Sequence, residues 1–221
     1  MISFSWDWQF FEDLLPSLMS GLQTTIIATL LGTVLAMVLG LVFILIRLAR
    51  IPVLSLAVTW FSCLIRGTPL LIQLYFLFFI LPGFGVVMSP LTTGIVGLGI
   101  NYAVQASEIY RAGIENIPRG QWEAAHSLSL PLPWMWRQVI LPQAVRPVIP
   151  MLGNLLVVMF KDSALLSAIA ITELVSAASQ VAQDNYRFIE PYTAAGLIFF
   201  IVSYISILGI RKLERWSTKR V

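Results

Sequence analysis

A polar segment interrupts this very hydrophobic chain at Gly120-Gln-Trp-Glu-Ala-Ala-His-Ser-Leu-Ser-Leu-Pro131, and Val139-Ile-Leu-Pro142 follows it after a short gap. The stretches on both sides are apolar, so the segment divides the sequence into two hydrophobic halves. A long amphipathic loop that ends in a proline would not stabilise a mainly apolar chain unless the loop faced water or a soluble protein. We therefore expect this segment to contact a separate, soluble protein.

Composition places the rest of the chain in a lipid bilayer. The 221 residues are 58% hydrophobic and only 11% charged, and the mean hydropathy is +0.85, which is far from the composition of a soluble domain. A transmembrane helix needs about 20 apolar residues. The alternating pattern of a membrane barrel is absent, so an all-α integral membrane protein is predicted. Runs of sufficient length predict five spans, at residues 18–46, 53–81, 90–112, 142–160 and 192–210.

Residues 164–182 are apolar and small but carry Thr172 and Glu173 at their centre, so a sixth span is the alternative. Charge placement favours five, because basic residues that follow the first, third and fifth spans then share one face, as the positive-inside rule requires. We predict an outside amino terminus, an inside carboxyl terminus and a segment 164–182 partly buried against protein. The inside cations are Arg47, Arg50, Arg111, Arg119, Arg137, Arg211, Lys212, Arg215, Lys219 and Arg220, and the outside carries Asp7, Glu12, Asp13, Asp184 and Glu190.

Several other functions are excluded by what the chain lacks. No Gly-x-x-x-x-Gly-Lys loop surrounds any of the lysines, so we expect ATP hydrolysis to occur on another chain. Cys63 and His126 are each the single residue of their type, which argues against a disulfide or a metal site. The basic pI of about 9.2 reflects inside loops and anionic lipid headgroups, so nucleic acid is not an expected partner. The amino terminus has no positive region before its apolar run and does not resemble a cleaved signal peptide.

Polar residues recur at helical spacing inside two of the predicted spans. Ser62, Arg66 and Gln73 share a face of the second span, and Gly67-Thr68-Pro69 can break the helix between them. Asn101, Gln105 and Glu108 form one stripe on the third span, and Asn154 adds a polar point on the fourth. Charges at membrane depth normally face water or each other. The stripe therefore indicates a polar pathway, or equally a structural Arg66–Glu108 pair that closes the bundle. Gly32, Ala36 and Gly40 form a small-residue stripe that favours close helix packing.

Three ordered motifs make the chain similar to a known family. Glu123-Ala124-Ala125, with Leu128 and Val139-Ile-Leu-Pro142, resembles the EAA motif of permease subunits in ATP-binding-cassette (ABC) importers. Arg66-Gly-Thr-Pro-Leu-Leu-Ile-Gln-Leu74 and Lys161-Asp-Ser-Ala-Leu165 resemble hallmarks of the polar amino acid uptake branch. The likeness extends from Gly21 to the last span. It implies a type I importer permease fold with a cytoplasmic coupling helix.

Two positions differ from the family pattern, which usually has Gly at Ser129 and Thr-Ser at Ser163-Ala164. Within the family, three segments resemble permeases of ectoine and hydroxyectoine uptake systems. These segments are Gln73-Leu-Tyr-Phe-Leu-Phe-Phe79, Tyr110-Arg-Ala-Gly-Ile-Glu115 and Tyr186-Arg-Phe-Ile-Glu-Pro191.

The resemblance implies one permease domain over residues 1–221 in a bacterial cytoplasmic (inner) membrane, with a coupling loop at 113–141. The partners it implies are an ABC ATPase dimer that holds ATP and Mg, a second permease copy that is identical or homologous, an extracytoplasmic solute-binding protein, and lipid. No cofactor is expected on this chain. The coupling residues it implies are Gly120, Glu123, Ala124, Ala125, Leu128, Ser129, Leu141 and Pro142. A helix from about residue 119 to 130 would dock with its Glu123 and Ala124-Ala125 edge in the ATPase.

The cargo is expected to be a polar amino acid or a similar zwitterion, and the finer resemblance implies ectoine or hydroxyectoine. The candidate lining residues are Arg66, Thr68, Gln73, Asn101, Gln105, Glu108 and Asn154. Lys161, Asp162 and Ser163 could form an outer gate, or only a salt bridge and cap at a helix end. Two other classes remain as alternatives. A self-sufficient carrier or channel would use Glu108 or Glu173 for an ion, and a membrane anchor would leave both polar stripes unexplained.

Overall fold

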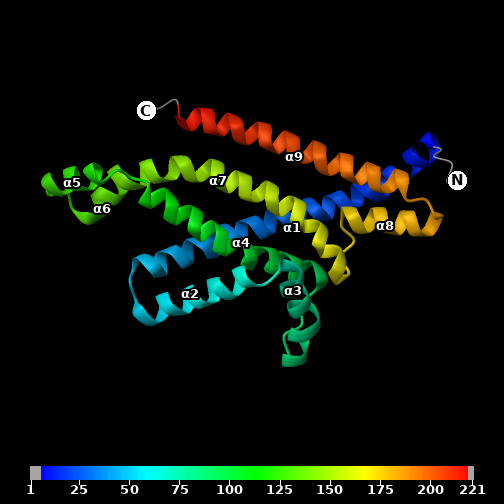
Figure 1. Ribbon diagram of the computed structural model, residues 1–221, viewed down its shortest axis with the longest axis horizontal. Helices are drawn as coiled ribbons and strands as arrows, with labels where there is room; N and C mark the ends of the chain where they lie inside the picture. Colours follow the sequence, from blue (N-terminus) through cyan, green and yellow to red (C-terminus); the bar gives the residue numbers. More distant parts are fainter. Residues whose placement is uncertain (1–5, 219–221) are drawn as a thin grey trace.

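The computed structural model describes residues 6–218, and every regular element in that part of the chain is a helix. Figure 1 shows an elongated bundle in which most helices run along the long axis. The α-helices are α1 (Trp8–Leu48), α2 (Pro52–Gly67), α3 (Leu70–Tyr75), α4 (Pro90–Glu115), α5 (Arg119–Ser127), α6 (Leu132–Trp134), α7 (Leu141–Asp162), α8 (Leu174–Asn185) and α9 (Ile189–Thr218). Two π-helices, η1 (Phe76–Ile80) and η3 (Met135–Ile140), and two 3-10 helices, η2 (Leu81–Phe84) and η4 (Ser163–Ile169), complete the set.

Three of the described helical segments are long and apolar enough to cross a membrane: Trp8–Leu48, Leu132–Ile169 and Ile189–Arg215. They contain the predicted first, fourth and fifth spans. The predicted third span lies within α4, a helix of 26 residues that interrupts its apolar sequence with Asn101 and Gln105. Its polar side chains make α4 less apolar than the other three, although it is long enough to cross.

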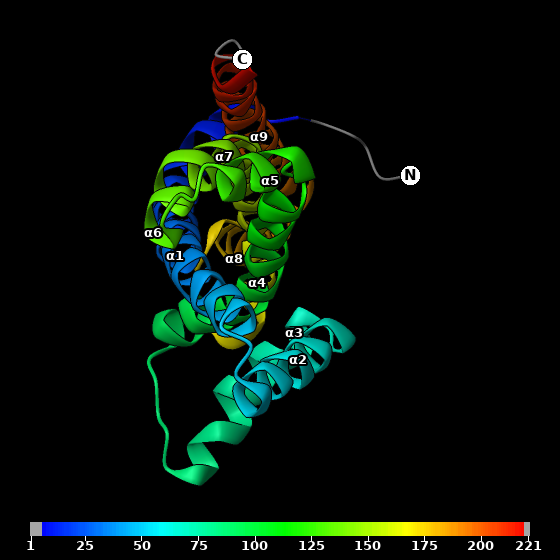
Figure 2. The same ribbon diagram turned by 90° about the vertical axis from the view of Figure 1, so that its left-hand side faces the viewer.

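The second predicted span, residues 53–81, is not one straight helix. It divides into α2 and a second piece, Leu70–Phe84, with a bend of 108° between them. The break falls at Thr68, whose backbone is extended, because Pro69 disfavours a helical conformation in the residue before it. As a result α2 and α3 project to one side of the bundle (Figure 2).

The centre of the molecule is the contact between α1 and α4, and small residues allow it. Gly40 faces α4 so closely that a Cβ there would lie 2.7 Å from the Ala106 Cβ and 2.8 Å from the Ala103 carbonyl oxygen. Gly32 lies against Leu98, and Ala36 is fully buried. The stripe predicted for close helix packing therefore does pack a neighbouring helix.

Residues 164–182 form a partly buried segment that contains most of two short helices. The 3-10 helix η4 ends at Ala170, which has a left-handed backbone (φ 59°), and α8 begins after Glu173. Leu166, Ile169 and Leu174 are fully buried. Glu173 is buried as well, and its carboxylate accepts hydrogen bonds from the backbone N–H groups of Val175 (2.8 Å) and Ser176 (2.7 Å) at the start of α8. The acidic residue is thus the amino-terminal cap of a helix that packs against α1 and α9.

The two ends of the bundle carry different charges. The carboxyl ends of α1 and α9 lie toward the end that holds α5 and α6, whereas the start of α1, α8 and the start of α9 lie at the other end (Figure 1). At that second end Arg187 bonds to Asp7 at 2.9 Å and to Glu190, and it lies over the ring of Phe10. The hydrogen bond from Arg187 lowers the pKa of the Asp7 carboxyl. Lys219 and Arg220 lie outside the described residues.

Candidate functional site

The helix break between α2 and α3 is held by one side chain. The Gln73 amide nitrogen donates to the carbonyl oxygens of Ile65 (2.9 Å) and Thr68 (3.0 Å) and to the Thr68 hydroxyl (2.9 Å). These carbonyl groups lose their helical partners at the bend, and an unpaired carbonyl is costly in lipid. Gln73 therefore stabilises the bend, and Thr68 adds a bond from its hydroxyl to the Leu64 carbonyl.

The same glutamine connects the break to α4. The Asn101 amide nitrogen donates to the Gln73 side-chain oxygen at 3.1 Å, across 28 positions in the sequence. Three of the predicted pathway residues, Thr68, Gln73 and Asn101, are thus joined in one hydrogen-bonded chain. A cavity of about 440 Å³ lies beside it, lined by Thr68 and Gln73 and otherwise by apolar residues of α2, α3, η1 and α4.

A second polar cluster surrounds Glu108, about two turns further along α4 than Asn101. Its carboxylate lies 2.8 Å from Arg47 of α1, 2.8 Å from Arg111 and 3.7 Å from Arg66 of α2. Arg47 also donates to the buried Ser62 hydroxyl at 3.1 Å. The predicted Arg66–Glu108 pair is present, but it is the longest of the three contacts, and the Arg66 side chain is half exposed. One carboxylate therefore ties α1, α2 and α4 together.

Two predicted pathway residues stand apart from both clusters. Gln105 lies on α4 between Asn101 and Glu108 but is exposed, and Asn154 is exposed on α7. An exposed amide in the middle of a 26-residue helix is unfavourable against lipid. Gln105 is therefore an exposed polar residue of the α4 stripe, and it lies between two clusters whose polar side chains bond to one another.

The predicted outer gate has a different arrangement from a Lys161–Asp162 salt bridge. Asp162 ends α7 and accepts a 2.6 Å hydrogen bond from the hydroxyl of Tyr102, a fully buried residue of α4. The Ser163 hydroxyl donates to the Phe160 carbonyl oxygen, as a helix-end residue does. Lys161 is exposed. The sequence reading missed Tyr102, because an aromatic residue on a mostly apolar stretch gives no sign of a carboxylate partner 60 positions away.

The polar segment at residues 120–131 contains most of a short helix, α5, which is fixed to its own chain. α5 is shorter than the predicted 119–130 and ends at Ser127. Trp122 lies edge to face against Trp136 of η3, with ring centroids 5.7 Å apart. Ala125 is buried in a cluster with Ile117, Met135, Ile140 and Ala144.

The residues of the predicted docking edge differ in exposure. Glu123, Ala124 and Leu128 are exposed, but the Ala125 side chain packs into the chain's own core and is not available to a partner. In a helix, neighbouring residues point in directions about 100° apart, which lets Ala124 be exposed while Ala125 is buried. Of the predicted docking edge, Glu123 and Ala124 are therefore exposed, and Ala125 anchors the helix beneath them.

The end of α5 explains why the family has Gly at position 129. Ser129 has a left-handed backbone (φ 51°), its N–H bonds to the His126 carbonyl, and the N–H of Leu130 bonds to the Ala125 carbonyl. This pair of bonds is the Schellman arrangement, whose left-handed residue is most often glycine. Ser129 is tolerated there at a cost in backbone strain.

The remaining coupling residues frame this helix. Gly120 lies in the first turn of α5 with open space around it, so it does not pack against the rest of the chain. Leu141 and Pro142 begin α7, where proline suits the first turn because its missing N–H would have no helical partner. Both residues are exposed.

Comparison with known proteins agrees with this arrangement. Residues 32–219 match the family described as binding-protein-dependent transport system inner membrane component. A probable amino-acid ABC transporter permease of Sinorhizobium fredii is 38% identical over 100% of this chain and 97% of its own. The arginine transport system permease of Bacillus subtilis is 34% identical over 71% of this chain and 72% of its own.

Solved structures show the same fold. A crystal structure of an amino acid ABC transporter with histidines superposes with a TM-score of 0.91 at 33% identity, covering 96% of this chain and 99% of that one. An inward-facing MetNI methionine ABC transporter shares the fold at a TM-score of 0.74, with 20% identity over 94% of this chain and 99% of that one. The chain therefore belongs to the binding-protein-dependent transport system inner membrane components, and it is a non-enzymatic, multi-pass permease subunit of an amino-acid ABC importer with the type I fold.

Proposed function

We propose that this permease couples ATP hydrolysis on a partner ATPase dimer, which holds ATP and Mg, to the uptake of a solute delivered by an extracytoplasmic binding protein. A second permease copy, identical or homologous, completes the path. The observation that carries this proposal is α5, a helix fixed to its own chain by Ala125 with Glu123 and Ala124 exposed above. ATP-driven closure of the ATPase pulls on α5 and rocks the permease between its inside-facing and outside-facing states.

Single changes on the exposed edge of α5 test the docking. Glu123→Lys reverses a charge and Ala124→Asp adds bulk and charge at the closest approach, so we expect uptake to fall to background and the ATPase subunit to be lost on purification. Membrane insertion should persist, because neither side chain packs into the core. The matched control is Glu12→Lys, the same charge change at the opposite end of the molecule, which should retain the ATPase. Full retention by both α5 variants would refute docking at this edge.

The path for the solute is proposed to follow the polar stripe of α4. Gln105 is the open position, with Asn101 and Gln73 satisfied on one side and Glu108 and its arginines on the other. In the assembled transporter this stripe faces an aqueous path instead of lipid, and Arg66 and Thr68 lie at its edge. Asn154 contributes from α7. Asp162, held by Tyr102, closes the outer end together with Lys161 and Ser163.

Gln105→Leu tests the path without disturbing either cluster. Loss of one hydrogen bond to the solute corresponds to roughly 0.5–1.5 kcal/mol, so the KM for uptake should rise about twofold to tenfold. Gln180→Leu is the matched control, because Gln180 is an exposed glutamine of α8 that bonds within its own helix. An unchanged KM in the Gln105 variant, with wild-type assembly, would remove Gln105 from the path.

The cargo is proposed to be a polar amino acid or a zwitterion of similar size. Among the similar permeases are systems named for arginine, cystine and octopine, all of which are amino acids or derivatives of them. Ectoine and hydroxyectoine are narrower proposals that rest on three sequence segments. ATPase activity of the complex in nanodiscs, with its binding protein, should rise with one member of a panel of basic, acidic and amide amino acids plus ectoine. Activity indifferent to every solute and to the binding protein would contradict a binding-protein-fed importer.

A further inference from the structure

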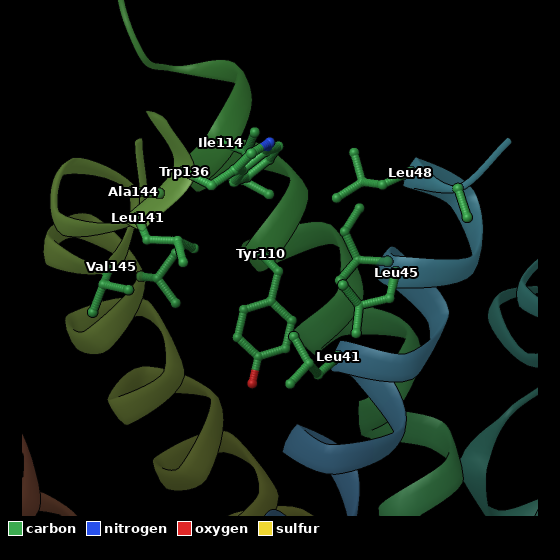
Figure 3. A pocket seen from close by; sticks show the side chains of 12 residues that line it. Leu41, Leu45, Leu48, Tyr110, Ile114, Trp136, Leu141, Ala144 and Val145 are labelled. Carbon is green, nitrogen blue, oxygen red and sulfur yellow. The ribbon is translucent and has the colours of Figure 1, made fainter. Parts of the chain in front are cut away.

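A deep apolar groove opens between three helices near the end of the molecule that carries α5. Its volume is about 590 Å³, and it lies between the last turns of α1, the last turns of α4, and the η3–α7 junction (Figure 3). The lining residues are Leu41, Ile44, Leu45, Leu48, Ala49, Tyr110, Ile114, Trp136, Leu141, Ala144, Val145 and Val148. None of these residues belongs to the polar stripe or to the exposed edge of α5.

The wall of the groove suits hydrocarbon. Ten of its twelve lining residues are aliphatic, and the two aromatic residues are committed to other contacts. The Tyr110 hydroxyl donates to the Met37 carbonyl of α1 at 3.3 Å, and the Trp136 ring lies against Trp122. Figure 3 shows the Tyr110 ring between the α1 side chains and those of α7, so its flat face forms part of the wall. A ligand in this groove gains free energy by burying apolar surface.

Two arginines directly follow lining residues in the sequence, one at the end of α1 and one in η3, and these two segments are termed the mouth of the groove. Arg50 follows Leu48 and Ala49 at the end of α1, and Arg137 follows Trp136 in η3. Both arginines are exposed, Arg50 after the last turn of α1 and Arg137 within η3. A guanidinium binds a phosphate group well because its N–H groups can donate in pairs. Anionic headgroups of the facing leaflet attract such residues by about 1 kcal/mol for each cation.

A second copy of the chain fits this surface less well. In a twofold dimer the same patch faces itself, so Arg50 and Arg137 would approach the corresponding arginines of the other copy. Like charges brought together in this way are unfavourable. The charge of the mouth instead complements an anion, and the hydrocarbon wall complements an acyl chain.

We propose that the groove is a binding site for one anionic phospholipid of the leaflet that faces α5. One acyl chain lies between α1, α4 and α7, and the headgroup phosphate binds Arg50 and Arg137. The lipid then occupies the space between the helix that carries the small-residue stripe and the helix that follows the coupling segment. Because α7 continues directly from η3, a bound chain connects lipid composition to the segment beneath α5.

Native mass spectrometry of the purified permease–ATPase complex tests this site, with phosphatidylglycerol and phosphatidylcholine of identical chains as probes. We expect retained phosphatidylglycerol to exceed phosphatidylcholine. Arg50→Gln and Arg137→Gln should each weaken phosphatidylglycerol binding about fivefold. Ala49→Trp fills the groove from an exposed position and should abolish the bound lipid. If that variant fails to fold, Leu45→Trp serves the same purpose from the α1 wall.

Controls separate this site from general lipid contact. Leu56→Trp adds the same side chain on the exposed face of α2, and Arg211→Gln removes an exposed cation of α9. Both should bind lipid as the parent does. Equal retention of the two lipids, or no effect of the arginine and groove-filling variants, would overturn the proposal. Glycerol phosphate that competes as well as the whole lipid would exclude the acyl chain, and loss of permease pairing in Ala49→Trp would assign the groove to a second copy.

Discussion

Ser129 is one of four described residues other than glycine that have a left-handed backbone. It holds the left-handed position at the end of α5, where a Cβ is unfavourable and glycine is not. Ser129→Gly should therefore stabilise the protein by about 0.4–1 kcal/mol, because it relieves local strain in excess of the entropy it adds to the unfolded chain. The melting temperature of the purified complex measures this directly.

Ser127→Gly is the control for that substitution. It places glycine two positions earlier, at the last residue of α5, where the backbone is helical and glycine should destabilise by roughly 0.5–1 kcal/mol. Opposite signs for the two variants are expected. The same sign for both would mean that the backbone at position 129 does not carry the strain described.

Individual residues also show how far the sequence alone could lead. Periodicity placed Asn101, Gln105 and Glu108 on one face of a helix, and the polar pair Arg66–Glu108 is indeed in contact. Periodicity did not identify Arg47, which lies closer to the Glu108 carboxylate than Arg66 does. Arg47 lies at the end of another helix, 61 positions earlier in the sequence. Spacing along one helix fixes which side chains share a face. Which faces meet depends on how two helices cross, and that is decided by packing across the whole contact.

At the scale of elements, the contact of α1 with α4 depends on glycine more than on large apolar side chains. Gly40→Val would place a branched side chain against Ala106 and the Ala103 carbonyl, so one helix must move away from the other. Overpacking of this kind costs about 1–3 kcal/mol, and we expect a clear fall in melting temperature.

Gly196→Val is the matched control within another long helix. Nothing lies within 4 Å of the position its Cβ would take in α9, so the same side chain meets open space. Its effect should be limited to helix propensity, well under 1 kcal/mol. Equal destabilisation by the two variants would show that the α1–α4 contact is not limited by side-chain volume at Gly40.

The break in the second predicted span shows a different limit. The Gly67-Thr68-Pro69 sequence predicted that a helix could break there, and the bend occurs at that place. Its size, 108°, and its stabilisation by Gln73 did not follow from the residues. A proline in the sequence predicts where a helix is weakened. The bend angle depends on which hydrogen-bond donors reach the backbone carbonyl groups that the break exposes.

For the whole molecule, the uneven distribution of charge predicts its orientation. We expect an outside amino terminus and an inside carboxyl terminus, because the basic end of the bundle should remain in the cytoplasm. In a Cys63→Ser background, Asp13→Cys should react with a membrane-impermeant thiol reagent in intact cells. His126→Cys should react only after the membrane is opened. The reverse pattern would invert the topology, and both positions are exposed in the structure.

The burial of Ala125 has a mechanical consequence. Ala125 and Trp122 pack against η3, and η3 runs without a break into α7. A displacement imposed on α5 should therefore move α7 by a similar amount. A coupling helix held only by flexible loops would absorb part of each stroke. In the proposed mechanism, the displacement of the partner and the tilt of α7 should scale together, because the Ala125 methyl group and the Trp122 ring connect α5 to η3.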